Sequence, residues 1–222
     1  MDRQTGFSDT PTRERILSSA KRQFLNHGFQ GASIRRIAAD AGVTYGALYG
    51  YFSSKEALFY ALIDPLADRI LEKLDQIEAD MRSLPASQRL SGMSGVFTAR
   101  LPELVDLIFE DREIVNLVIG GSKGTKYEHF MADLVKRDVM AISAAGDSST
   151  PGLHPFDAQT LEMMMEGYMA ALFHLIVSGR DRQAVEQSMN LFTGICAAGM
   201  LALMEDSGDE NTAGGTDHEQ QS

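Results

Sequence analysis

The chain has 222 residues with a net charge of −11, 44% of them hydrophobic and 23% charged, values typical of a soluble globular protein of one domain or two small ones. Its single cysteine, Cys196, excludes an intrachain disulfide framework, and its apolar content is sufficient for a core that needs no structural metal. The first residues contain no basic segment followed by an apolar run, so we expect no secretory signal and a cytoplasmic location.

The charge is distributed unevenly along the chain. Residues 1–60 carry eight basic and five acidic side chains, whereas the remainder carries 12 basic and 26 acidic ones. A weakly basic N-terminal part on an acidic body indicates that the two parts have different partners. The basic excess is small and does not by itself establish nucleic-acid binding.

The N-terminal part is predicted to form short helices. Residues 1–9 are polar, and we expect them to be disordered. Pro11 suits the first position of a helix that Gly28 ends. Ser33 is predicted to cap a second helix, which Gly42 ends.

A third and a fourth helix follow. Thr44 is predicted to cap a very short helix that extends to about Tyr51. Ser53 and Glu56 stand three residues apart, the spacing of a capping box that opens the fourth helix. Pro65 is expected to kink or break that helix, because proline cannot donate a backbone hydrogen bond.

The rest of the chain is also predicted to be helical. No segment shows a sustained period-two alternation of apolar and polar residues rich in β-branched side chains, the pattern that indicates a β-strand. The expected helices cover residues 87–98, 101–119, 125–145, 157–178 and 181–204. From Glu205 onward the tail holds six acidic residues and no basic ones, and we expect it to be disordered. The predicted fold is all-α. Its parts are a three-helix domain in residues 10–53, a helical body in residues 54–204 and an acidic tail in residues 205–222.

The second and third predicted helices flank the tight connection Ala41-Gly42-Val43. Packed on the first helix, they would form a helix-turn-helix unit whose last helix enters the DNA major groove. That groove is about 12 Å wide and requires a slim helix, which Gly46 and Ala47 provide. The neighbouring threonine and tyrosines offer hydroxyls for phosphates or bases, and methyl groups and ring edges for thymine methyls.

In order and spacing, residues 12–62 resemble the DNA-binding domain of the TetR family, the tetracycline-repressor-like bacterial regulators. The matching residues are Ile16-Leu17, Phe24, Gly28-Phe29, Ser33, Ile37-Ala38, Ala41-Gly42-Val43, Gly46-Ala47-Leu48-Tyr49, Tyr51-Phe52 and Ser54-Lys55-Glu56-Ala57-Leu58. The resemblance implies a homodimeric transcriptional regulator of a double-stranded DNA operator. The remaining three quarters of the chain, roughly, resemble the family only in length and helical character.

The resemblance also implies roles for individual residues. By position, Ser33 bonds a phosphate, the residues that open the third helix meet bases or phosphates, and Tyr49, Tyr51 and Lys55 hold the DNA backbone. The full predicted DNA-binding set is Ser33, Arg35, Thr44, Tyr45, Gly46, Ala47, Tyr49, Tyr51 and Lys55. Tyr45 departs from the small or basic residues usual at its position, which leaves the base preference open. Arg35 is either a DNA contact or a solvated helix charge.

The C-terminal helices are predicted to form a dimer interface. Residues 187–204 contain no charged side chain, and a helix that is apolar on nearly all sides must be covered on nearly all sides. A second copy of the chain is the simplest cover, and the run is too polar for a membrane span. The alternative is an intramolecular core. The predicted interface set is Leu161, Tyr168, Leu172, Phe192, Ile195, Cys196, Gly199 and Leu203.

The resemblance places a ligand pocket inside the helical body. Twelve methionines suit an adaptable apolar cavity, although ordinary core packing is the alternative for each of them. The predicted lining is Phe97, Phe109, Tyr127, Phe130, Met165, Met169, Phe173 and His174. The leading hypothesis is a repressor that an apolar or amphipathic small molecule releases from an inverted-repeat operator. The alternatives are a regulator that needs its ligand or activates, and a helical protein that works through protein contacts.

Enzyme chemistry has little support in the sequence. Residues 120–124 are glycine-rich but lack the order of a phosphate-binding loop. The histidines do not pair at metal-binding spacing, and no Gly-x-Ser-x-Gly elbow occurs. We therefore expect no catalytic site, no metal and no cofactor.

Overall fold

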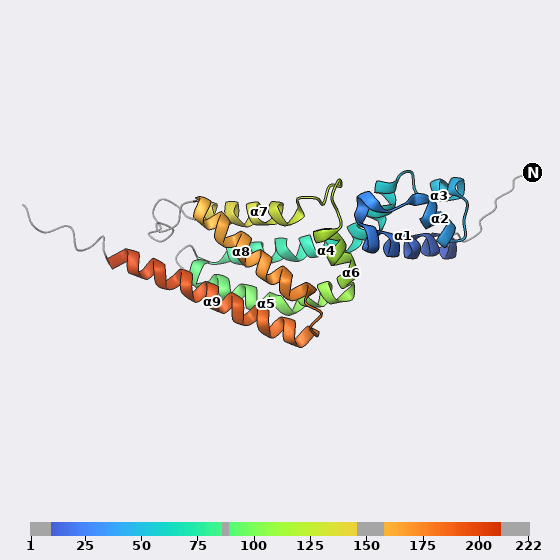
Figure 1. Ribbon diagram of the computed structural model, residues 1–222. Helices are drawn as coiled ribbons and strands as arrows, with labels where there is room; N and C mark the ends of the chain where they lie inside the picture. Colours follow the sequence, from blue (N-terminus) through green and yellow to red (C-terminus); the bar gives the residue numbers. More distant parts are fainter. Residues whose placement is uncertain (1–9, 86–88, 146–157, 210–222) are drawn as a thin grey trace, which may run out of the picture. The chain divides into compact units, whose positions relative to one another are not determined.

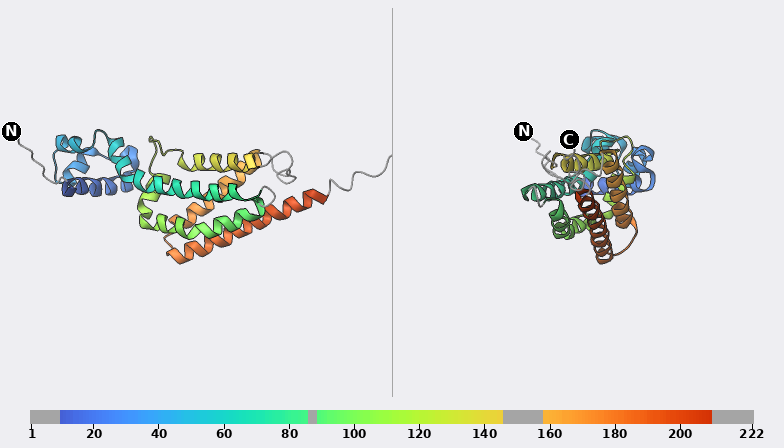
Figure 2. Two further views of the ribbon diagram at one scale, coloured as in Figure 1. Left: turned by 180° about the vertical axis from the view of Figure 1, so that it is seen from behind. Right: turned by 90° about the vertical axis from the view of Figure 1, so that its left-hand side faces the viewer.

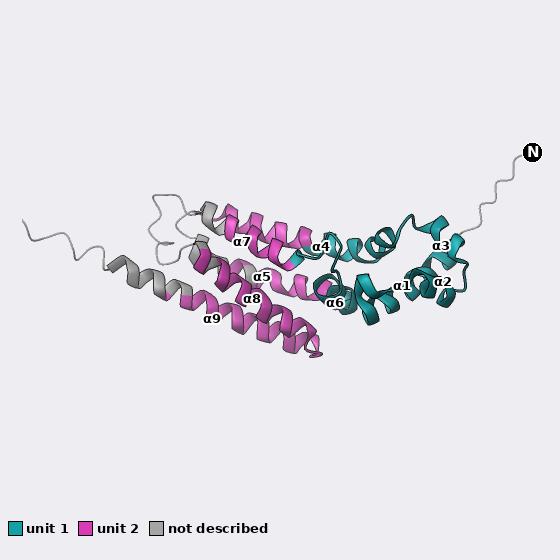
Figure 3. Cartoon of the chain, turned by 45° about the horizontal axis from the view of Figure 1, so that its top comes forward, with its two compact units in different colours: residues 1–70, 110–130 teal, residues 71–109, 131–222 magenta. Residues whose placement is uncertain are grey.

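The computed structural model of the protein describes residues 10–85, 89–145 and 158–209 (Figures 1 and 2). Every regular element in these residues is an α-helix, which confirms the predicted all-α fold. Their contacts divide the chain into two compact units (Figure 3). The head unit extends as far as Ile70 and also contains Glu110–Phe130. The body unit contains Leu71–Phe109 and the residues that follow Phe130.

The head unit begins with three helices whose caps follow from the sequence. They are α1 (Thr10–Gly31), α2 (Ile34–Asp40) and α3 (Tyr45–Tyr51). The Ser33 Oγ accepts the Arg36 N–H at 3.4 Å, and the Thr44 Oγ1 accepts the Ala47 N–H at 3.1 Å. Both predicted N-caps are confirmed, because a side-chain oxygen satisfies a free N–H of the first turn.

Two glycines end these helices where the sequence predicted. Gly28 has φ 65° and ψ 176°, so the regular part of α1 stops there and a final turn continues to Gly31. Gly42 has φ 68°, and its N–H donates to the Ala39 carbonyl at 3.0 Å. Positive φ is costly for residues that carry a Cβ, and glycine removes that cost.

The fourth helix differs from its prediction at two points. α4 (Lys55–Ser83) is capped by Ser54, whose Oγ accepts the Ala57 N–H at 3.0 Å, and not by Ser53. The helix also continues through Pro65 without a break. An interior proline costs about 3 kcal/mol through one lost hydrogen bond and a steric clash. The buried Leu58, Phe59 and Ile63 of the same helix offset that cost.

The core of the head unit lies between α1 and the helices that cross it. Phe24, Ile37 and Leu48 are fully buried. The Phe59 ring meets those of Phe24 and Phe29 at centroid distances of 4.9 and 5.1 Å. This core determines how α2 and α3 lie on α1, because apolar side chains from every helix of the unit fill it.

The head unit also contains α6 (Arg112–Gly120) and the loop that follows it. The Phe29 N–H donates to the Gly121 carbonyl at 2.7 Å, and the Tyr127 hydroxyl donates to Asp64 at 2.8 Å. Lys126 forms an ion pair with the same Asp64 carboxylate at 3.0 Å. These contacts attach the loop to α1 and to the first part of α4.

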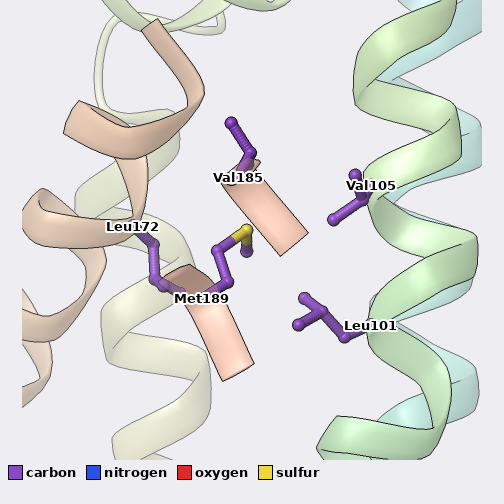
Figure 4. Packing of buried hydrophobic residues seen from close by; sticks show 5 residues of the cluster. All are labelled: Leu101, Val105, Leu172, Val185 and Met189. Carbon is purple, nitrogen blue, oxygen red and sulfur yellow. The ribbon is translucent and has the colours of Figure 1, made fainter. Parts of the chain in front are cut away.

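The body unit contains the rest of α4 together with α5 (Arg89–Glu110), α7 (Phe130–Ala145), α8 (Ala158–Val177) and α9 (Arg182–Asp209). Its buried cluster joins α5, α8 and α9 (Figure 4). Figure 4 shows Leu101 and Val105 of α5 facing Val185 and Met189 of α9, with Leu172 of α8 beside them.

The boundaries in this part differ from the predicted ones. Pro102 lies inside α5, and the break falls at Asp111, whose side chain caps α6 by accepting the Ile114 N–H. α9 continues through Glu205 to Asp209, beyond the predicted start of the tail. The division expected after residue 53 also differs from the observed units, because Leu58, Phe59 and other α4 side chains are buried in the head core.

Candidate nucleic-acid interface

Helix α3 exposes one face while its other face anchors it in the head core. Leu48 is fully buried, whereas Tyr45 is 49% exposed and Tyr49 is 38% exposed. The turn before the helix is closed by the Val43 N–H, which donates to the Ala38 carbonyl at 3.0 Å. The geometry is that of a helix-turn-helix, in which α2 is the first helix of the pair and α3 is the second, with an exposed face.

The two exposed tyrosines form one unit. The Tyr45 hydroxyl donates to the Tyr49 hydroxyl at 3.4 Å, and the rings meet edge to face at a centroid distance of 5.0 Å. The contact with Tyr45 raises the pKa of Tyr49. A tyrosine hydroxyl is protonated near neutral pH in any case, so the Tyr49 hydroxyl has a hydrogen for an external acceptor. The Arg35 guanidinium lies 5.9 Å from the Tyr45 ring centroid, within cation–π range.

The predicted phosphate contacts on the helix caps are accessible. The Thr44 side chain is exposed and that of Ser33 is half-buried. Each hydroxyl oxygen accepts a cap hydrogen bond and still has a hydrogen to donate. The backbone at Gly46 and Ala47 is exposed as well, so α3 presents a slim surface there.

Lys55 has a structural role that sequence reasoning missed. Its Nζ donates to the Gln30 carbonyl at 3.1 Å and lies 4.9 Å from the centroid of the Phe29 ring. Burial lowers the pKa of this lysine. An ammonium has three donors, so the contact at the end of α1 leaves two for a phosphate.

The nine predicted DNA-binding residues all lie in the head unit, on α2, on α3, at the N-caps of these helices or, for Lys55, at the start of α4. Tyr51 is half-buried at the end of α3, the least accessible of the tyrosines on that helix. Arg13 is a further basic neighbour, with its guanidinium 5.4 Å from the centroid of the Phe52 ring. Nothing in the sequence pattern singled out Arg13, because only the fold brings α1 against the end of α3.

The predicted ligand-lining residues belong to both units of the chain. The Tyr127 and Phe130 rings meet edge to face in the head unit at a centroid distance of 5.8 Å, and the Tyr127 hydroxyl donates a hydrogen bond to Asp64. Phe109 and Met169 pack against the buried cluster of the body unit. Met165 and Phe173 are half-buried there and His174 is exposed, while the Phe97 side chain lies outside the described part of the chain.

An open pocket of about 340 Å³ lies on the head unit. Its lining is Ile119, Gly120, Ser122, Lys123, Glu128 and His129. These residues come from the end of α6 and the loop that follows, and none of them belongs to the predicted ligand set.

The predicted dimer residues divide between two faces of α8 and α9. Leu172 is buried, and the Tyr168 and Phe192 rings stack at 5.5 Å on the core of the body unit. Ile195 is 61% exposed. Gly199 is exposed as well and Cys196 is half-buried. The Leu161 and Leu203 side chains lie outside the described residues.

Two large apolar side chains on the exposed faces were missed. Leu191 is 67% exposed and Met163 is 66% exposed. Leu191 stands four residues before Ile195, so both lie on one side of α9, away from the buried Val185 and Met189. This spacing was visible in the sequence, but it indicates an outer face only once the inner face is known.

Two negative findings apply to the described part of the chain. None of its helices combines the length and the hydrophobicity required to cross a membrane. In the same residues, no three or more His, Cys, Asp or Glu side chains group as metal ligands would.

This geometry places the chain in the class of helix-turn-helix proteins. Residues 16–62 match the family model described as "Bacterial regulatory proteins, tetR family". The chain is 38% identical over 72 residues to the HTH-type transcriptional repressor AcnR of Corynebacterium efficiens, a segment that covers 32% of this chain and 38% of AcnR. It is 41% identical over 63 residues to the HTH-type transcriptional regulator UidR of Escherichia coli K12, covering 28% of this chain and 32% of UidR.

The likeness to solved structures covers most of the chain. A transcriptional regulator of Aquifex aeolicus VF5 superposes with a TM-score of 0.54, covering 83% of this chain and 99% of that one at 20% identity. A TetR-like regulator of Rhodococcus sp. RHA1 gives a TM-score of 0.55, with 85% and 96% coverage at 20% identity. The sequence match spans about two fifths or less of the named relatives, and the structures support the fold. The matched family model and the named relatives are all described as regulators.

Proposed function

We propose that the protein is a transcriptional regulator that binds an inverted-repeat DNA operator as a homodimer. The observation that carries this proposal is the outward face of α3. Leu48 anchors the helix in the core, while the Tyr45–Tyr49 pair stands exposed beside Arg35. A slim, uncharged helix with hydroxyls and a nearby cation suits the major groove and the phosphates that border it.

Binding to the groove would use the phosphate contacts for affinity. The Ser33 and Tyr49 hydroxyls and the remaining donors of Lys55 provide these contacts. Every neutralised phosphate releases counterions, so the logarithm of the binding constant falls by about 0.9 per phosphate for each decade of salt.

The direct test is a gel shift with the DNA upstream of the chain's own gene, repeated over a salt series. We expect a discrete complex that weakens steeply with salt. A complex whose affinity is independent of salt, or no complex on any duplex from a genomic library, would refute DNA binding and favour the alternative of a helical interaction protein.

The homodimer is proposed from the exposed faces of α8 and α9. Met163, Leu191 and Ile195 are each more than 60% exposed, and residues 187–204 carry no charge to keep such a face in water. A two-fold symmetric partner covers the same face on both chains. Binding to two half-sites of an inverted repeat requires the two copies of α3 to lie about 34–36 Å apart, the separation of successive major grooves on one side of DNA.

Analytical ultracentrifugation tests the dimer. Ile195→Asp should convert it to a monomer, because the carboxylate would be buried without a partner. Met140→Asp is the matched control, since Met140 is 70% exposed on α7, outside the proposed interface. A wild-type monomer at the concentrations at which DNA is bound, or equal dimerisation of the two variants, would contradict this interface.

We further propose that an apolar or amphipathic small molecule releases the protein from DNA, as in a ligand-controlled repressor. The methionine-rich α8, with Met163, Met164, Met165 and Met169, supports an adaptable apolar site. A thermal-shift screen of hydrophobic compounds, followed by gel shifts with each stabilising compound, tests the direction of control. Loss of the complex supports release, whereas a complex that forms only with the compound favours the ligand-requiring alternative.

A further inference from the structure

The exposed face of α3 lacks the side chains that read guanine or adenine through two hydrogen bonds at once. Residues 44–51 have the sequence TYGALYGY and contain no Arg, Lys, Asn or Gln. Guanine is read in the major groove by a bidentate Arg or Lys, and adenine by a bidentate Asn or Gln. The helix that presents itself to the groove can form neither of these pairs.

The Tyr45 hydroxyl is already engaged. It donates its hydrogen to the Tyr49 hydroxyl, so it can serve a phosphate or a base acceptor only by giving up that bond. The Tyr49 hydroxyl keeps its hydrogen and is the phosphate donor of the pair. Tyr45 therefore offers its exposed ring to the groove while its hydroxyl contacts that of Tyr49.

The Tyr45 ring is held in place from two sides. The Tyr49 ring meets it edge to face at 5.0 Å, and the Arg35 guanidinium lies 5.9 Å from its centroid. The ring remains 49% exposed, and Ala47, two residues further along the helix, adds an exposed methyl group. The result is a fixed apolar surface at the start of an uncharged helix.

We propose that α3 reads thymine methyl groups, with the Tyr45 ring and the Ala47 methyl as the contact surface. This inference rests on the proposed DNA binding and specifies which base edge the same surface recognises. The C5-methyl of thymine is the apolar group that a T·A pair offers in the major groove, and no other unmodified base carries it. Arg35 steadies the ring and does not read guanine.

The experiment removes the C5-methyl group of thymine from the DNA and leaves the rest of the base unchanged. Duplexes bound by the protein are selected from a randomised pool, and the enriched sequences are copied with deoxyuridine in place of thymidine. Uracil keeps every hydrogen-bonding group of thymine. We expect selected half-sites rich in thymine and a loss of affinity of about fourfold for each contacted methyl, the value for burying one such carbon group. Copies made with 7-deazaguanine, which lacks the N7 acceptor, should bind as well as the parent.

Two variants of Tyr45 test whether its ring causes the preference for thymine over uracil. Tyr45→Phe keeps the ring and should keep the thymine-over-uracil ratio, whereas Tyr45→Ala should lower it by the part that the ring contributes, about fourfold for one methyl. Circular dichroism checks that both variants keep the helical fold, and the exposed position of Tyr45 makes unfolding a poor explanation of any change. A uracil effect that is undiminished in Tyr45→Ala would arise from another cause, such as DNA shape, and would overturn the proposal.

Other outcomes also overturn this reading. Equal binding of the thymine and uracil duplexes would refute methyl recognition while leaving DNA binding intact. A loss with 7-deazaguanine that disappears in Arg35→Ala would assign base reading to Arg35. If no duplex is enriched from the pool, the proposed function itself fails, so the two failures are distinguishable.

Discussion

Replacing Tyr127 by phenylalanine tests whether the loop after α6 is held on the head unit as the structure shows. The Tyr127 side chain is 5% exposed, and its hydroxyl donates to the Asp64 carboxylate at 2.8 Å. A hydrogen bond to a charged group contributes about 1.5–3 kcal/mol to stability. We expect the lower end of this range, because Lys126 stays paired with Asp64 at 3.0 Å and leaves no orphaned charge.

The contribution should depend on pH in a defined direction. Burial, followed by the hydrogen bond to Asp64, raises the pKa of Tyr127 above its ordinary value. A raised folded-state pKa means that the neutral hydroxyl is favoured in the native chain. The stabilisation is therefore fully present below the unfolded value of about 10, and it is lost as the pH rises above that value toward the folded pKa.

Urea unfolding of the wild type and of Tyr127→Phe at neutral pH and at about pH 11 measures both effects. At neutral pH the variant should be less stable by roughly 1.5 kcal/mol with an unchanged m-value. The difference between the proteins should shrink at the higher pH. Equal stability at neutral pH, or a difference that grows with pH, would refute the reasoning. A double-mutant cycle with Asp64→Asn isolates the pair, and its coupling energy should account for most of the loss.

Three further predictions concern the head unit. Leu48→Ala should lower the free energy of unfolding by about 2–5 kcal/mol in urea titrations, because Leu48 is fully buried, and DNA binding should weaken with it. Ser33→Ala should lower the free energy of unfolding by about 1 kcal/mol, because α2 loses its N-cap. It should also weaken gel shifts with all DNA sequences alike, and a change confined to one sequence would contradict a phosphate role. Lys21→Met removes the ion pairs of 2.8 Å to Asp111 and Glu113, so it should lower the free energy of unfolding by about 1 kcal/mol at low salt and by less at high salt. A loss of stability that salt does not reduce would argue against ion pairing.

The local features of the head were predictable because they depend on neighbours in the sequence. Ser33 and Thr44 cap the helices that follow them, and Gly28 and Gly42 end the ones before, as their backbone preferences require. Pro65 shows the limit of such reasoning. Its local cost is real, but burial of the surrounding α4 side chains offsets it, and a sequence window contains no measure of burial.

The sequence by itself determined the helical class, the tight turn between α2 and α3 and the set of side chains that α3 presents, since all three follow from residues within a few positions of one another. The tertiary structure decided which groups meet. It placed Arg35 over the Tyr45 ring, tied Lys55 to the end of α1 and joined α6 to the head unit. It also showed which sides of α8 and α9 are buried. These contacts join residues distant in the chain, and only the packing of a shared core brings such residues together.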